Sequence, residues 1–176
     1  MAEKDHTDAA PRTVAASESE LIRWMSIQDA NSAGFIHGGV VMRMCDEVAG
    51  IAAIRHSGCR VVTAGMDRMT FASPLYVGEL LRCTASVNAA WRTSMEVGVR
   101  VEAENAVTRE VRHTSTAYLT MVAVDEHGKP VPVPPLRVEG PKEERRQREA
   151  ETRRRNRLTE REEILKARQA AGEETG

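Results

Sequence analysis

The clearest pattern in the chain is a change in the spacing of its hydrophobic residues near residue 57. From Gly39 to about Arg55, apolar and small residues surround four polar positions, a pattern typical of a helix that is buried on nearly every side. After a His-Ser-Gly breaker, apolar residues alternate with polar ones, as in strands that bury one face. The alternating runs are residues 79–91, 94–104 and about 111–124, and two further strand candidates are residues 21–27 and 61–71.

Long half-buried strands joined by short links favour an antiparallel meander. The pattern therefore predicts an α+β fold in which one long, curved antiparallel sheet wraps around a central buried helix. An ordinary two-layer α+β sandwich satisfies the same pattern, because the period of hydrophobic residues does not report how strongly a sheet curves.

The two ends of the chain differ in composition from its centre. Residues 1–19 are polar and aperiodic, which predicts a disordered leader before a folded domain at 20–138. Residues 139–176 are rich in Glu and Arg and predict a charged C-terminal helix, supported by pairs four residues apart such as Glu144 and Arg148. Few apolar residues line this helix, so we expect it to be solvated rather than packed as a coiled coil.

The composition of the 176 residues excludes several classes of function. A formal net charge of -1 gives no reason to expect nucleic acid or an anionic membrane as partner, and 3% aromatic residues disfavour a base-stacking surface. No segment approaches the roughly 20 apolar residues of a membrane span, and no signal peptide is evident, so we expect a soluble, cytoplasmic protein. Cys45, Cys59 and Cys83 show no CxxC spacing, and we interpret Cys45 and Cys83, which fall on apolar faces, as reduced core thiols.

Asp46 is the first candidate for chemistry, because it lies in the middle of the apolar predicted helix. Burying an ionised carboxylate costs several kcal/mol unless a partner compensates it, so stability alone seldom explains such a residue. Apart from residues 42 and 43, the helix face that carries Asp46 is lined by small residues (Gly39, Ala49, Gly50 and Ala53), which allows a ligand, a second helix or a second sheet to approach closely. The neighbouring Glu47 is explained by a local ion pair with Arg43, so we assign the chemistry to Asp46.

A His-Gly-Gly turn opens the same helix. Gly38 and Gly39 offer free backbone N–H groups at the positive end of the helix dipole, which suits the oxyanion of an acyl-transfer intermediate. Asp46 would then activate water as a general base or attack the acyl carbon itself. Asn31 in the preceding loop can orient the water or the carbonyl. Simpler explanations are a loop-capping hydrogen bond for His37 and an Asx turn for Asn31.

These residues carry a resemblance to a known family. The runs GFIHGGVVMRMCDEVAGIAAIRH, SMEVGVRVEAE and VAVDEHGKPVPVPPL, with the Glu/Arg tail, resemble the acyl-CoA thioesterases of the hotdog fold. The likeness spans residues 21–168 and is to the group that includes the brain acyl-CoA hydrolase and the bacterial YciA-type proteins. It implies that two subunits pair edge to edge, with active sites at their interface, and that three dimers form a hexamer.

The resemblance also implies roles for individual residues. The catalytic Asp of the group falls on Asp46 and its loop Asn on Asn31, so a homodimer would hold two equivalent sites. A strand Thr close to the site falls on Thr63. We expect the substrate to contact His37 as well, and the CoA phosphates to lie near a set of surface residues: Arg68, Arg92, Thr93 and Ser94.

We therefore expect an enzyme that hydrolyses fatty acyl-CoA to free CoA and fatty acid, without a metal or redox cofactor, since CoA enters as part of the substrate. One alternative is a non-catalytic acyl-CoA binding or sensing protein on the same fold. Another is a structural oligomer whose tail recruits partners. A dehydratase of the same fold is disfavoured, because no second acid is suitably placed with His37.

Overall fold

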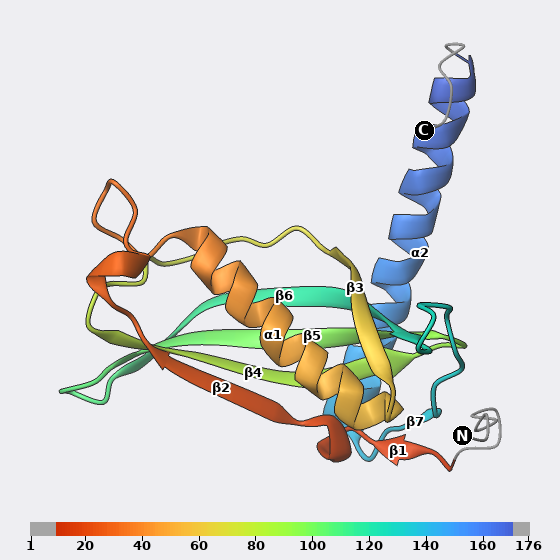
Figure 1. The fold of residues 1–176 in the computed structure, drawn as a ribbon, viewed down its shortest axis with the longest axis horizontal. Coiled ribbons are helices and arrows are strands. Elements are labelled where there is room, and N and C mark those ends of the chain that lie inside the picture. Colours follow the sequence, from red (N-terminus) through yellow and green to blue (C-terminus); the bar gives the residue numbers. More distant parts are fainter. Residues whose placement is uncertain (1–9, 171–176) are drawn as a thin grey trace.

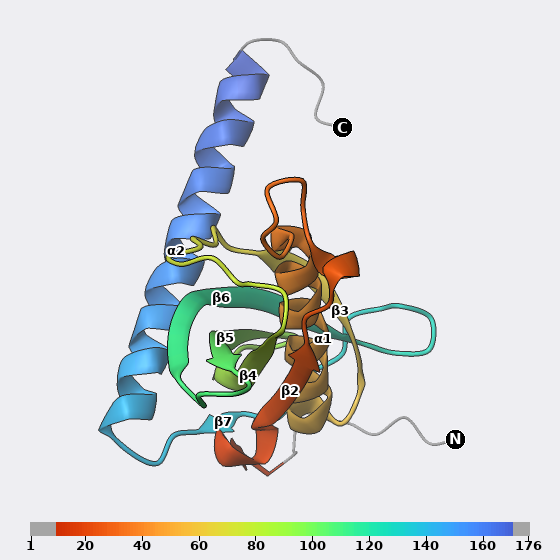
Figure 2. The same ribbon diagram turned by 90° about the vertical axis from the view of Figure 1, so that its left-hand side faces the viewer.

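A single antiparallel sheet curls around one long helix in the computed structural model of the protein, which describes residues 10–170 (Figures 1 and 2). The five strands follow the order β2-β4-β5-β6-β3, so β2 and β3 are the two edges. The wrapped α+β arrangement is thus confirmed, and the two-layer sandwich is not formed. The elements are β2 (Ser19–Trp24), α1 (Gly38–Ser57), β3 (Arg60–Met66), β4 (Glu79–Ala90), β5 (Ser94–Asn105) and β6 (Val111–Val124).

The core lies between α1 and the concave face of the sheet. The helix presents small side chains to the sheet, and Cys45, Ala49 and Ala53 are fully buried there. Small residues let the sheet approach the helix closely, while larger ones on the strands fill the remaining space. The alternation predicted from sequence holds along all three long strands, whose fully buried residues include Leu81, Val87, Met95, Val97, Val99, Val101 and Leu119.

The outer face of α1 is open, contrary to the expectation of a helix buried on nearly every side. Met42 is 42% exposed, Ile54 is 49% exposed, and Asp46 lies on the same exposed face. The prediction that Asp46 is buried is therefore wrong for a single chain. The physical reason is that one curled sheet covers only one side of a helix, so the apolar residues on the other side remain for another surface to cover.

The N-terminal segment is more ordered than expected, because the predicted leader contains two structured pieces. Strand β1 (Arg12–Thr13) pairs in parallel with β7 (Leu136–Arg137), and the short helix η2 (Ala15–Ser17) follows it. The Ser17 side chain is fully buried: its Oγ accepts from the N–H of Val87 at 2.9 Å. The prediction of disorder is thus wrong for residues 12–19, and residues 1–9 lie outside the described residues.

Two of the predicted strands are shorter than expected. The first ends at Trp24 and is followed by the short helix η3 (Ile27–Asp29), where the side chain of Asp29 caps the N–H of Ser26. The strand predicted over 61–71 ends at Met66. After that point the chain leaves the sheet and returns towards the start of α1.

The C-terminal helix α2 (Pro141–Ala170) confirms the predicted helix and packs on the outer face of the sheet (Figure 2). Glu96, which alternation placed on the polar face of β5, is 0% exposed because α2 covers it. Arg153 compensates that buried carboxylate, with Nη2 2.6 Å from Glu96 Oε1. The first half of α2 is therefore packed on the sheet and is not fully solvated, contrary to the expectation from the sequence. The second half projects beyond the sheet, and Leu158 and Ile164 are exposed there.

Cys45 and Cys83 pack between α1 and β4 as buried thiols. A hydrogen bond with Cys45, together with burial, raises the pKa of the Cys83 thiol, so the thiolate is disfavoured and the pair acts as apolar packing. Among residues 10–170, we find no helix with both the length and the apolar character needed to span a bilayer.

Replacing Ser17 tests whether the N-terminal segment belongs to the folded domain. Ser17→Ala leaves the buried N–H of Val87 without its acceptor, so we expect the free energy of unfolding to fall by about 1–3 kcal/mol. Urea denaturation measures it, with the exposed Ser32→Ala as control. Equal stability of the two variants would mean that the segment is not docked in solution.

Candidate active site

The carboxylate of Asp46 is held by an edge strand. Thr63 on β3 donates its hydroxyl to Asp46 Oδ1 at 2.5 Å, which fixes the carboxylate against the sheet. The Thr63 hydroxyl oxygen is also 3.6 Å from the sulfur of Met121 on the neighbouring strand. The register of β3 shifts between Thr63 and Gly65, and Thr63 lies at the start of that irregularity. One carboxylate oxygen is thus oriented by the protein, and no described residue bonds the other.

Glu47 forms the local ion pair with Arg43 that the sequence predicted. Arg43 Nε lies 2.9 Å from Glu47 Oε1, one helical turn away on the exposed face. This pair leaves Asp46 as the carboxylate on the β3 side of the helix.

At the start of α1, the His-Gly-Gly turn offers one free amide rather than two. His37 is the N-cap, and its Nδ1 accepts from the N–H of Gly39 at 2.9 Å, which confirms the capping interpretation of His37. The expectation that Gly39 polarises a carbonyl is therefore wrong for this conformation, because its amide is occupied. Among the described residues the amide of Gly38 has no acceptor. A side chain at position 38 would crowd Phe71, whose ring lies 3.3 Å from the position a Cβ would take.

Asn31 forms the Asx turn that was the alternative reading of this residue. Its Oδ1 accepts from the N–H groups of Ala33, at 2.9 Å, and Phe35, at 3.2 Å. A bridge between Ala30 and Ile36 folds the loop back towards the helix start. Because Oδ1 is occupied, the side-chain group that remains available is the Nδ2 amide, a donor. Asn31 is thus better suited to bond a carbonyl oxygen than to accept a proton from water.

These residues form two groups, one at the start of α1 and one at its middle, that are too far apart to share one substrate atom. Gly38 and Asp46 are separated by eight positions, which is about 12 Å along a helix. A base or nucleophile and an oxyanion donor must each lie about 3 Å from the reacting group. We call Asn31 and Gly38 the helix-start half-site, and Asp46 and Thr63 the mid-helix half-site. One chain holds both half-sites but does not bring them together.

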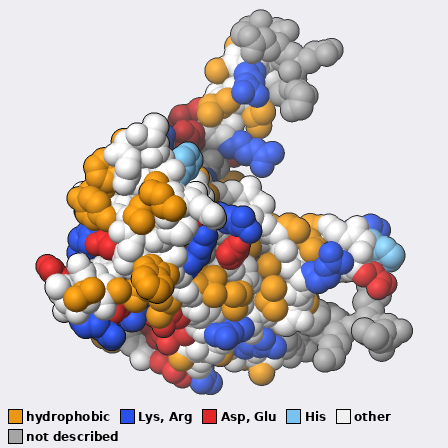
Figure 3. Space-filling view, turned by 60° about the vertical axis from the view of Figure 1, so that its left-hand side comes forward, with side chains coloured by type: hydrophobic (Ala, Val, Ile, Leu, Met, Phe, Trp, Pro, Cys, Tyr) orange, Lys and Arg blue, Asp and Glu red, His pale blue; other side chains and the backbone are white. Residues whose placement is uncertain are grey.

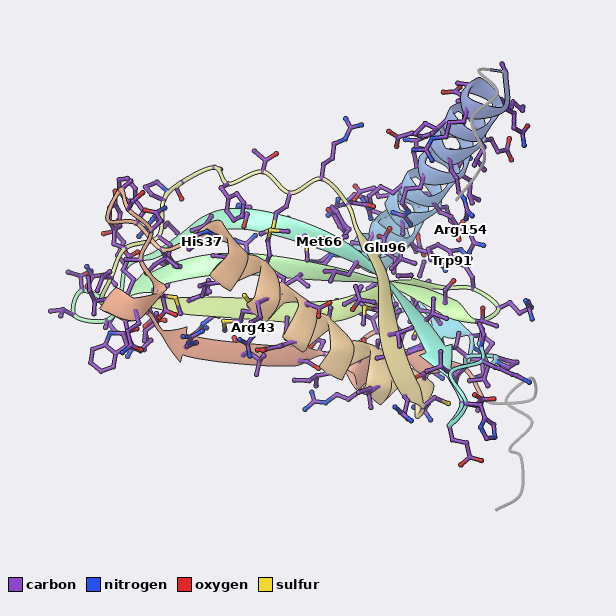
Figure 4. The ribbon with its side chains drawn as sticks, turned by 45° about the horizontal axis from the view of Figure 1, so that its top comes forward. His37, Arg43, Met66, Trp91, Glu96 and Arg154 are labelled. Carbon is purple, nitrogen blue, oxygen red and sulfur yellow. The ribbon has the colours of Figure 1, made fainter. Side chains whose placement is uncertain are left out.

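The residues expected to bind CoA phosphates lie in two separate segments of the chain. Arg68 follows β3 and is almost fully exposed, with Nη2 3.3 Å from Glu160 Oε1 on α2. Arg92 and Thr93 lie in the turn from β4 to β5 and Ser94 begins β5, next to Trp91, which lies beneath Arg154 of α2 (Figure 4). His37 lies at the far, N-terminal end of α1 in the same view, so a single chain does not join it to the predicted binding residues next to Trp91.

Three cavities lie against the sheet or α1 in the described part of the chain. The largest of these, about 330 Å³, is between the outer face of the sheet and the first turns of α2, with polar lining such as Ser86 and Asn88. A second, about 230 Å³, lies between β2 and α1 and is lined by residues such as Leu21 and Met44. A smaller one, about 160 Å³, lies at the helix start and is lined by apolar residues such as Ile36, Phe71 and Leu75. Within residues 10–170, no three His, Cys, Asp or Glu side chains gather where they could hold a metal ion.

The end of the molecule around the helix start carries exposed hydrophobic side chains (Figure 3). Trp24 and Ile27 are each about 70% exposed or more, and Phe35 stacks edge-on against Tyr76 at 5.6 Å between ring centroids. A patch of this kind on a soluble protein usually marks a contact with another surface.

Comparison with known proteins identifies the family. The sequence profile described as the thioesterase superfamily matches residues 33–109. The rat cytosolic acyl coenzyme A thioester hydrolase is 36% identical over 138 residues, which are 77% of this chain and 36% of the rat protein. The chain thus spans about a third of that relative's length.

Solved structures match nearly the whole chain. The Staphylococcus aureus acyl-CoA hydrolase, solved with butyryl-CoA, CoA and CoA disulfide, has a TM-score of 0.83 at 31% identity, covering 92% of this chain and 99% of that one. A hexameric acyl-CoA thioesterase, solved without ligand, has a TM-score of 0.82 at 39% identity, covering 86% of this chain and 97% of that one.

The S. aureus enzyme has also been solved as Asp, Asn and Thr variants, each changed to Ala. In that enzyme the Asn precedes the Asp by 15 residues and the Thr follows it by 17, which are the spacings of Asn31, Asp46 and Thr63 here. With the curled sheet, the central helix and these matches together, the chain belongs to the thioesterase superfamily of hotdog-fold proteins.

Proposed function

We propose that the protein is an acyl-CoA thioesterase that hydrolyses fatty acyl-CoA to free CoA and a fatty acid. The observation that carries the proposal is the Asp46 carboxylate, oriented by Thr63 on an open face of α1. The shared spacing of Asn, Asp and Thr with an enzyme that binds butyryl-CoA and CoA supports it. The rat relative is named as cytosolic, and we extend this location to the present protein.

We further propose that two copies of the chain complete each active site. The free edge of β3 carries the exposed Val62, and the adjacent face of α1 carries the exposed Met42 and Ile54. Two-fold pairing of β3 edges would extend the sheet and lay the two α1 helices side by side in opposite directions. The helix-start half-site of one copy would then meet the mid-helix half-site of the other, which gives two sites per dimer.

Assembly of dimers into a hexamer is the larger unit that we propose. The hexameric thioesterase that matches this chain supports it, as does the hydrophobic patch around Trp24, Ile27, Phe35 and Tyr76. The patch lies outside the β3 edge, so it remains available for a contact between dimers. We propose three dimers per hexamer.

The proposed reaction uses groups that the chain itself supplies. The thioester carbonyl oxygen accepts from the Gly38 N–H and the Asn31 Nδ2 group, which stabilise the negative charge that forms on it. Asp46 either removes a proton from an attacking water or attacks the acyl carbon to form an anhydride that water then opens. The C–S bond breaks, and the departing CoA thiolate takes up the proton that water gives up, through Asp46 in the general-base route or when water opens the anhydride in the other route. In this scheme no metal or redox cofactor takes part.

Binding of the two ends of the substrate follows from the same arrangement. The apolar cavity at the helix start, between Ile36, Phe71 and Leu75, would accept acyl carbons next to the thioester. The exposed guanidinium of Arg68 would meet a phosphate of CoA, with Arg92, Thr93 and Ser94 as further candidates. We propose that neither a nucleic acid nor a membrane is a partner of this protein.

The role of Asp46 is tested by replacing it. In Asp46→Asn the carboxylate is lost at constant size, so we expect kcat to fall by at least about a hundredfold. Release of CoA, followed with a thiol-reactive dye over acyl-CoAs of increasing length, measures it. Glu47→Gln, at the next position and in an ion pair with Arg43, is the matched control and should keep kcat within about twofold. Near-wild-type turnover in Asp46→Asn would refute the proposal, and acyl-CoA binding without CoA release in the wild type would favour a binding protein.

The shared site is tested by complementation. We co-express Asp46→Ala chains with Asn31→Ala chains, each inactive alone. If each site takes Asp46 from one copy and Asn31 from the other, random pairing restores about a quarter of the wild-type sites. Activity of the mixture at the background of the single variants would show instead that one chain supplies both residues of a site.

A further inference from the structure

Two consecutive residues at the exit of β3 are each bonded to the C-terminal helix. Asp67 Oδ2 lies 2.6 Å from Arg157 Nη1, and Arg68 Nη2 lies 3.3 Å from Glu160 Oε1. Arg157 and Glu160 are three positions apart, so they lie on one face of α2. The helix therefore contacts the chain at the point where it leaves the strand that holds Thr63.

The two ion pairs differ in how far water reaches them. The side chains of Asp67 and Arg157 are 21% and 29% exposed, whereas those of Arg68 and Glu160 are 94% and 60% exposed. Exposed pairs of long side chains contribute little, because water competes and both side chains lose freedom. The Asp67–Arg157 pair is thus the contact that holds the segment.

Arg157 is itself held by a buried group. Its Nη1 is 3.3 Å from Glu96 Oε2, and Glu96 is fully buried. Arg153 contacts both oxygens of the same carboxylate and lies over the ring of Tyr118 at 3.6 Å. Figure 4 shows Glu96 on the sheet beneath α2. Loss of Arg157 would therefore leave α2 docked through Arg153, while Asp67 would lose its partner.

The segment after Asp67 makes few backbone hydrogen bonds to the sheet before it reaches the helix start, and Met69 is its partly buried contact with the core. The N–H of Asp67 bonds the carbonyl of Tyr118, and the next backbone bond of the segment to the sheet is from Ala72 to Thr114, both at 2.9 Å. Arg68 lies between these points, so the ion pair of the neighbouring Asp67 side chain helps to fix the backbone that carries Arg68. Thr63, by contrast, is held by the β3–β6 ladder opposite Met121.

We propose that Arg157 is a positioning residue for substrate binding: through Asp67 it fixes the backbone that presents Arg68 to the nucleotide end of CoA. The inference rests on the proposed function of the site, in which Arg68 meets a CoA phosphate. Because Asp46 and Thr63 are held independently of this pair, the effect falls on binding and not on the chemical step. A role for α2 in substrate binding follows from this contact.

The test compares two substrates in Arg157→Gln. With an acyl-CoA, we expect KM to rise about five- to tenfold while kcat stays within about twofold. With the same acyl group on N-acetylcysteamine, a thioester without the nucleotide, we expect kcat/KM to equal that of the wild type. Asp67→Asn breaks the pair from the other side and should behave alike, and Arg157→Lys, which keeps the charge, should recover part of the loss. Equal losses with both substrates would reduce Arg157 to a structural role and overturn the proposal.

Two further variants sharpen the test. Glu160→Gln removes the solvated pair one turn further along α2 and is the matched control, expected to leave KM within about twofold. In the double variant Arg68→Ala/Arg157→Gln, KM should match that of Arg68→Ala alone, because Arg157 acts through Arg68. Additive losses would show that Arg157 acts by another route and would contradict the proposal.

Calorimetric binding of CoA separates this inference from the proposed function. This measurement needs no turnover. Arg157→Gln should raise the Kd of CoA about five- to tenfold, and Glu160→Gln should leave that Kd unchanged. If the wild type binds CoA but releases none from acyl-CoA, the thioesterase proposal fails while this comparison still decides the role of Arg157. If the wild type hydrolyses acyl-CoA and Arg157→Gln binds CoA as tightly, only the role of Arg157 is refuted.

Discussion

The geometry of a sheet curled around a helix determines where the chemistry of this protein lies. The sheet covers one side of α1, whose residues Val48 and Ala52 are fully buried there, and leaves the other side open. Asp46 lies on that open side, where Thr63 of an edge strand fixes it. On the same helix the free amide of Gly38 is about 12 Å away. A carboxylate and an oxyanion donor at that separation serve one carbonyl only if a second copy of the chain covers the open side.

The charged C-terminal helix α2 compensates a buried charge of the sheet. Glu96 is a carboxylate with no exposure to water, and burying it is costly unless its charge is compensated. Arg153 and Arg157 compensate it, and Arg157 also reaches Asp67 at the end of β3. The helix α2 is thus bonded both to the sheet and to the residue that follows β3, the strand that carries Thr63.

Much of the fold could be predicted from the sequence, because hydrophobic alternation is a local property. The strands at Glu79–Ala90, Ser94–Asn105 and Val111–Val124 were predicted to within about a residue at their ends. The features that were missed depend on contacts between distant segments. Ser17 completes the bonding of Val87, 70 residues later, and Glu96 is buried only because α2 returns across the sheet. The exposure of Asp46 was missed for a similar reason, since the surface expected to cover it belongs to another chain. The candidate residues Asp46, Asn31 and Thr63 were predicted from their spacing and from the resemblance. The hydrogen bond from the Gly39 amide to His37 was seen only in the three-dimensional structure.

The most direct test of the account is a crystal structure of the Asp46→Asn variant with a non-hydrolysable acyl-CoA analogue, in which a methylene separates the carbonyl from sulfur. The account predicts that the carbonyl oxygen lies about 3 Å from the Gly38 amide of one copy, with the side chain at position 46 of the other copy beside the carbonyl carbon. A carbonyl held by residues of one chain alone, or bound away from α1, would contradict it.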